Sequence, residues 1–166
     1  DRPRLLRRRH EQRRRDEILD TASQLFAANG LRVSLEEIAG ACGIKPGSLY
    51  HHFDSKEAIV VDLVRRYQAD LDQLANDFLA HNRGASPERA EELIRELSAS
   101  IARLAVTHGA AVHFTFYDPP GGAGDELVQL AHRQPVAIRK AMLSALRLGE
   151  GAGWIRSGLD LDVVSD

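Results

Sequence analysis

The sequence is poor in cysteine and in long apolar runs, and each shortage excludes a class of protein. Cys42 is the only cysteine among 166 residues, which excludes a disulfide framework and favours a reducing compartment. No apolar run approaches the ~20 residues that a membrane-spanning helix needs, and no signal-peptide pattern precedes the first helix. We therefore expect a cytoplasmic protein without a membrane span.

Patterns typical of catalytic and metal sites are also missing. The seven histidines include no H-x3-H pair, and Cys42 has no second cysteine with which to share a metal. The glycine-rich stretch 121–124 follows no strand and so cannot be a phosphate-binding loop. The acidic pairs at 91–92 and 125–126 lie at expected helix starts, where acidic side chains favour the helix. We predict no catalytic residue, no metal site and no cofactor.

Positive charge is concentrated at the N-terminal end. Residues 1–56 hold 11 Lys/Arg against 8 Asp/Glu, a balance of +3, whereas residues 57–166 hold 11 against 16, a balance of −5. Eight arginines lie within the first fifteen positions: Arg2, Arg4, Arg7, Arg8, Arg9, Arg13, Arg14 and Arg15. We interpret residues 1–15 as an arm that contacts phosphates, and a solvated tail that aids solubility is the alternative.

Hydrophobic periodicity predicts an all-α fold without strands or repeats. The first expected helix starts at Arg9 or Arg13 and ends at Asn29. The other expected helices cover 35–41, 46–52, 54–81, 86–107, 110–118 and 125 to 149 or 151. We expect Asp54 to cap the fourth helix and Pro135 to kink or break the last. Helix 54–81 would be roughly 40 Å long, at about 1.5 Å per residue, and so would link two helical bundles.

Residues 34–53 have the local signals of two short helices joined by a tight turn. Ser34 and Glu37 have the spacing of a capping box at the first helix. Gly43 supplies the positive φ that ends a helix, and Pro46 suits the first turn of the next one. The second helix is too short to be stable alone, and its expected exposed face is polar, small or basic. This is the design of a helix-turn-helix, whose second helix enters the major groove of DNA.

The segment resembles the DNA-binding domain of TetR-type transcriptional repressors. The resemblance covers roughly residues 16–60: Leu25-Phe26 and Ala28-Asn29-Gly30, Ile38-Ala39, Gly43-Ile44, the run 47–53, and Ser55-Lys56-Glu57. It implies three domains: the arm 1–15, a helix-turn-helix domain 16–56, and a C-terminal ligand-binding and dimerisation domain 57–166. The chain lacks an initiator Met and stops where an eighth helix would open, so we expect the dimer contacts to lie beyond it.

The resemblance implies the partners and the DNA-contacting residues. Such regulators bind a double-stranded operator as homodimers and release it when a small-molecule inducer enters the C-terminal bundle, so a bacterial, nucleoid-associated repressor is expected. The predicted DNA-binding residues are Ser34, Lys45, Gly47, Ser48, Tyr50, His51 and Lys56, with Arg13 and Arg14 from the arm. Leu49 and Phe53 are predicted core residues. Because the recognition helix has few long polar side chains, direct reading of bases should be sparse.

Residues of the C-terminal helices are candidates for the ligand pocket. They are His113, Phe114, Phe116, Tyr117, Arg139 and Met142. Aromatic side chains and one Met could line an apolar cavity, and His113 or Arg139 could meet a polar group, although ordinary core and surface roles are equally open. The runs 50–53 and 159–163 are similar to those of regulators of fatty-acid or steroid breakdown that sense acyl-CoA compounds.

Two functions from different classes remain open. The first is a ligand-responsive repressor with an acyl-CoA or lipid-like inducer. The second is a DNA-binding module whose C-terminal bundle only dimerises or recruits a protein. A peripheral membrane protein is disfavoured, because the basic arm lacks the large apolar face of interfacial helices.

Overall fold

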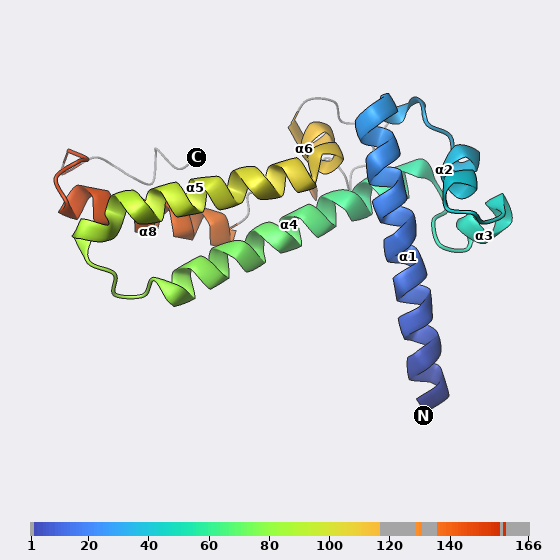
Figure 1. The fold of residues 1–166 in the computed structure, drawn as a ribbon, viewed down its shortest axis with the longest axis horizontal. Helices are drawn as coiled ribbons and strands as arrows, with labels where there is room; N and C mark the ends of the chain where they lie inside the picture. Colours follow the sequence, from blue (N-terminus) through green and yellow to red (C-terminus); the bar gives the residue numbers. More distant parts are fainter. Residues whose placement is uncertain (1, 117–128, 131–135, 157, 159–166) are drawn as a thin grey trace. The chain divides into compact units, whose positions relative to one another are not determined.

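All regular secondary structure in the described part of the chain is helical (Figure 1). A computed structural model describes residues 2–116, 129–130, 136–156 and 158. The α-helices within these ranges are α1 (Arg2–Asn29), α2 (Leu35–Ala41), α3 (Pro46–Tyr50), α4 (Lys56–His81), α5 (Ala90–Thr107), α6 (Gly109–Phe116) and α8 (Val136–Gly151). The predicted all-α class is confirmed. Among these residues, none of the helices is long and apolar enough to cross a membrane.

The chain divides into two compact units, and the division falls inside α4. Unit 1 comprises residues 1–66 and 108–132, and unit 2 comprises residues 67–107 and 133–166. The helix-turn-helix therefore shares its unit with the first three turns of α4 and with α6. The sequence-based boundary at 56/57 lies about three helical turns earlier. Because α4 is one continuous helix, its backbone belongs to both units.

The core of unit 1 is built around α1. Ile18, Ala22 and Phe26 recur along one face of α1 and are at most 3% exposed. They give α1 the apolar stripe that lets α2 and α6 pack against it. From α6, the ring of Phe114 meets that of Phe26 edge to face, with 5.7 Å between the ring centroids and an angle of 81°.

Unit 2 has a smaller core made by three helices. Its buried cluster comprises Ala75 of α4, Leu97 of α5, and Ala141 and Ala145 of α8. Small side chains on α8 allow that helix to approach α5 closely. A short 3-10 turn, Pro87–Arg89, precedes α5, so the helix expected from Ser86 begins as α-helix only at Ala90.

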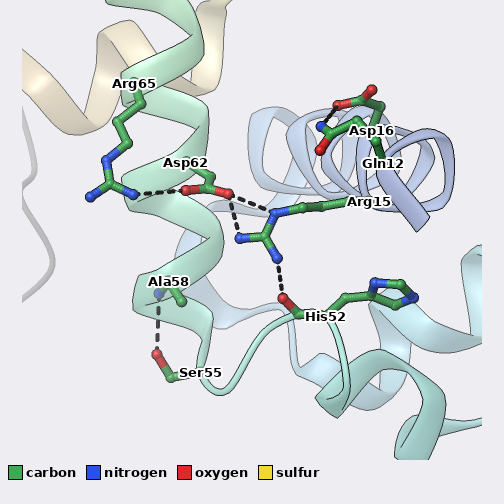
Figure 2. Close-up of polar contacts among 8 residues, drawn as sticks. All are labelled: Gln12, Arg15, Asp16, His52, Ser55, Ala58, Asp62 and Arg65. Carbon is green, nitrogen blue, oxygen red and sulfur yellow. Dashed lines mark hydrogen bonds and ion pairs between the residues drawn. The ribbon is translucent and has the colours of Figure 1, made fainter. Parts of the chain in front are cut away.

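Two expected helix ends differ from those in the structure. The predicted start of the first helix is wrong, because α1 begins at Arg2 and makes most of the expected arm helical. Arginine favours helix, and exposed i,i+4 pairs such as Arg7–Glu11 add to that tendency. The predicted cap of α4 is also wrong: the hydroxyl of Ser55, not Asp54, accepts from the backbone N–H of Ala58 at 3.1 Å (Figure 2). The expected break at Pro135 lies outside the described residues.

Candidate nucleic-acid interface

The first helix of the motif begins with the predicted capping box. The Glu37 backbone N–H donates to the Ser34 hydroxyl at 3.1 Å, and the Ser34 N–H donates to the Glu37 carboxylate at 2.7 Å. Hydrogen bonds from the Ser34 backbone and side chain, in that order, lower the pKa of Glu37 below its ordinary value. The two reciprocal bonds fix the direction in which the chain enters α2.

The turn after α2 is closed by the predicted glycine. Gly43 has a φ of 65°, a conformation that side chains disfavour. Its N–H donates to the carbonyl of Gly40 at 3.0 Å, and the N–H of Ile44 donates to that of Ala39 at 3.0 Å. These two bonds form a Schellman motif, which satisfies the last carbonyls of α2 and reverses the chain within one residue.

Helix α3 follows this turn and presents a polar face. Pro46 is its first residue, and the helix ends at Tyr50, two residues earlier than predicted. Leu49 is fully buried, and Phe53 just after the helix is 1% exposed, which confirms both as core residues. The exposed side chains of this face are Lys45, Ser48, Tyr50 and His51, and Gly47 leaves the backbone open between them. One buried leucine therefore anchors a helix whose other positions face solvent.

Lys56 lies in the first turn of α4 and is half-buried. Its amino group donates to the carbonyl of Leu31 at 2.6 Å and to that of Val33 at 3.2 Å. The amino group thus holds the connector between α1 and α2 against the start of α4. The contact of Lys56 with a DNA phosphate remains a prediction. The ammonium group has a third N–H that could make this contact.

Two predicted arm residues lie on the exposed side of α1. Arg13 Nε lies 3.4 Å from the Glu17 carboxylate, and Arg14 Nη1 lies 2.9 Å from the same group. Such exposed pairs contribute little to stability, so either arginine can exchange this partner for a phosphate. Their role in DNA binding remains a prediction.

Arg15 turns in the opposite direction, into unit 1 (Figure 2). Its Nε and Nη2 donate to one oxygen of Asp62 on α4 at 3.0 and 2.6 Å. Its Nη1 donates to the backbone carbonyl of His52, just beyond α3, and its guanidinium lies 4.0 Å from the centre of the Phe53 ring. Sequence reasoning grouped Arg15 with the phosphate-contacting arm and missed this role. Its spacing of three residues from buried Ile18 was the available signal.

The predicted ligand residues occupy different environments. Phe114 is 1% exposed in the core of unit 1, and His113 is exposed on the same helix. In unit 2, Met142 is 41% exposed and Arg139 is half-buried. Tyr117 and the side chain of Phe116 lie outside the described part. Whether any of them binds a ligand remains a prediction.

Unit 2 contains a cavity of about 510 Å³ that lies between side chains of α4 and α5 and is open to solvent. The described residues that line it are Asp70, Gln73, Leu74, Asp77, Phe78, His81, Glu96, Leu97 and Ser100. His113, Phe114, Arg139 and Met142 are not among them. Sequence reasoning missed this set because it searched the later helices, although the apolar stripes of α4 and α5 carry Leu74, Phe78 and Leu97.

Comparison with known proteins identifies relatives of the whole described fold. A profile of bacterial regulatory proteins of the tetR family matches residues 18–63. The transcriptional repressor KstR2 of Rhodococcus jostii is 30% identical over 154 residues, which cover 90% of this chain and 72% of the repressor. The solved structure of the ketosteroid transcriptional regulator KstR2 of Mycobacterium tuberculosis is also 30% identical, with a TM-score of 0.65 over 92% of this chain and 76% of that one. CprB of Streptomyces coelicolor, solved with its operator, shares the fold at 24% identity and a TM-score of 0.64, over 93% of this chain and 74% of CprB.

Proposed function

Because the chain belongs to the TetR family of bacterial regulatory proteins, we propose that it is a repressor that binds a palindromic operator as a homodimer and is released by a small molecule. Its relatives are transcriptional regulators, and the chain is a DNA-binding transcriptional regulator rather than an enzyme. The palindromic operator, the homodimer and the release by a small molecule belong to the proposal.

The observation that carries the proposal is the exposed face of α3. Gly47 lets the DNA backbone approach closely, and the hydroxyls of Ser48 and Tyr50 can bond to base edges or phosphates. His51 and Lys45 extend the same face. Few of these side chains are long, so contacts to phosphates from Ser34, Lys56, Arg13 and Arg14 would supply much of the affinity.

The proposed dimer follows from the geometry of helix-turn-helix binding. A single five-residue recognition helix reads only a few base pairs, whereas two related by a twofold axis read a palindrome with half-sites about 34–36 Å apart. Helix α4 is the continuous element between the two units. A ligand that changes its direction would alter the spacing of the two recognition helices.

The cavity in unit 2 is the proposed inducer site. Leu74, Phe78 and Leu97 offer apolar contacts to a lipid-like or steroid-like group, in keeping with the relative described as a ketosteroid regulator. Asp77 and Glu96 would repel phosphates, so the nucleotide part of an acyl-CoA would have to lie outside the cavity. A bundle that only dimerises or recruits a protein is the second candidate, and an open cavity favours the first.

A substitution that fills the cavity tests the inducer site. Ser100 on α5 is half-buried and lines the cavity, whereas Ser98 on the same helix is exposed. The Ser100→Trp variant should keep DNA binding but lose its release by steroid or fatty acyl-CoA esters, measured by fluorescence anisotropy of an operator duplex. The Ser98→Trp control should keep both. If none of these compounds releases or stabilises the wild-type protein, the second candidate replaces the first.

A further inference from the structure

Three segments of unit 1 meet at the guanidinium of Arg15. The side chain comes from α1, its bidentate partner Asp62 comes from α4, and its third contact is the carbonyl of His52 at the end of the recognition helix α3. Figure 2 shows the guanidinium between the two partners. We propose that Arg15 is a positioning residue that holds the C-terminal end of α3 against α4 in the orientation that DNA requires. The inference rests on the proposed DNA-binding function.

The contact reaches α3 through a short, hydrogen-bonded path. The N–H groups of His52 and Phe53 donate to the carbonyl of Leu49 at 2.8 and 3.0 Å. The peptide that carries the His52 carbonyl is therefore bound directly to the last turn of α3. A helix of five residues has too few internal hydrogen bonds to hold its own direction, so an external contact at its end matters.

The environment of Arg15 suits positioning better than phosphate binding. Its side chain is 33% exposed, compared with 79% for Arg13. Asp62, with a side chain only 19% exposed, supplies the opposite charge to Arg15 through one carboxylate oxygen and pairs with Arg65 at 3.2 Å through the other. The guanidinium lies over the Phe53 ring, and its fork geometry allows it to bond a carboxylate and a carbonyl at once. Its donors are thus directed into the protein.

The ion pair between Arg66 and Asp20 offers a matched control. Arg66 on α4 bonds to Asp20 on α1 at 2.6 Å, so this pair also joins α4 to α1. This bond joins α4 to α1 and not to the recognition helix. The Arg66→Met substitution removes the same charge from the same helix pair, and it leaves the contacts of Arg15 in place.

The test measures binding of the full-length protein to two labelled duplexes of equal length. One duplex is selected by the wild-type protein from a random pool, and the other is unselected. Arg15→Met and Asp62→Asn should each weaken binding to the selected duplex by about tenfold or more. The double variant should lose little beyond either single one, because Asp62 acts on α3 through Arg15. Arg66→Met should bind the selected duplex like the wild type.

The sign of the Asp62→Asn effect separates positioning from phosphate contact. If Arg15 merely bound phosphates, removal of the neighbouring negative charge would strengthen DNA binding, and that result would overturn the proposal. Arg15→Lys provides a second test if Arg15→Met fails to fold, as judged by circular dichroism. Lysine keeps the charge but lacks the fork, so it should not restore binding to the selected duplex, and full restoration would refute the role. A wild-type protein that selects no duplex would instead disprove the proposed function.

Discussion

The amino group of Lys56 lies 2.6 Å from the carbonyl oxygen of Leu31, across the whole helix-turn-helix. A second bond, to the carbonyl of Val33 at 3.2 Å, holds the same connector. The two ends of the DNA-binding motif are therefore joined by one side chain. Lys56 has a structural task beside any contact with DNA.

Replacement of Lys56 should affect both stability and DNA binding. Lys56→Ala leaves the carbonyls of Leu31 and Val33 without this donor and should lower the free energy of unfolding by about 1–2 kcal/mol. It should also weaken binding to operator and random DNA alike, with the salt slope reduced by about one. Urea unfolding and anisotropy titrations at several salt concentrations measure the two effects. If the variant is destabilised but its salt slope is unchanged, then Lys56 has a structural role and does not contact a phosphate.

Tyr50 should behave differently, since its side chain is 46% exposed on α3. Tyr50→Phe removes only the hydroxyl and should change the free energy of unfolding by less than about 0.5 kcal/mol. Its affinity for the operator should nevertheless fall, because a hydrogen bond to the DNA is lost. An unchanged affinity in anisotropy titrations would exclude the hydroxyl from the interface.

Deletion of residues 1–9 tests the basic end of α1. The arginines at positions 4, 7, 8 and 9 are all exposed, so their contacts with phosphates would act through the release of counterions. The truncated protein should lose affinity mainly at low salt and equally for all sequences. If the deletion instead changes the preferred base at a flanking A·T step, then this end of the protein reads the minor groove.

The capping box should make unfolding sensitive to acid. The pKa of Glu37 is lowered in the folded protein from an ordinary value of 4.5, so its carboxylate stabilises the fold above that pH. This contribution is lost as the pH falls below 4.5 and through the lowered pKa. Glu37→Gln keeps a capping side chain but removes the titration, so the two proteins should differ in stability at pH 7 and differ less at pH 3. Urea unfolding at both pH values is the measurement, and a constant difference would contradict the assignment.

The features that the sequence predicted well are local ones. Ser34, Gly43 and Pro46 act within three or four residues of themselves, so their spacing alone identifies the capping box, the turn and the start of α3. The pairing of Arg15 with Asp62 joins residues that are 47 positions apart, and no periodicity reveals it. The cavity likewise depends on which faces of α4 and α5 meet. The apolar stripe of each helix does not specify that pairing.

The burial of Leu49 beside an exposed face has a consequence for the evolution of this protein. Folding depends on one side chain of α3, whereas Lys45, Gly47, Ser48, Tyr50 and His51 contribute little to the core. Mutations at these five positions should cost little stability, whereas loss of stability removes most mutations in the core. A regulator built in this way can acquire a new target sequence while its scaffold stays the same. The same five positions are the ones to randomise when the protein is redesigned for another operator.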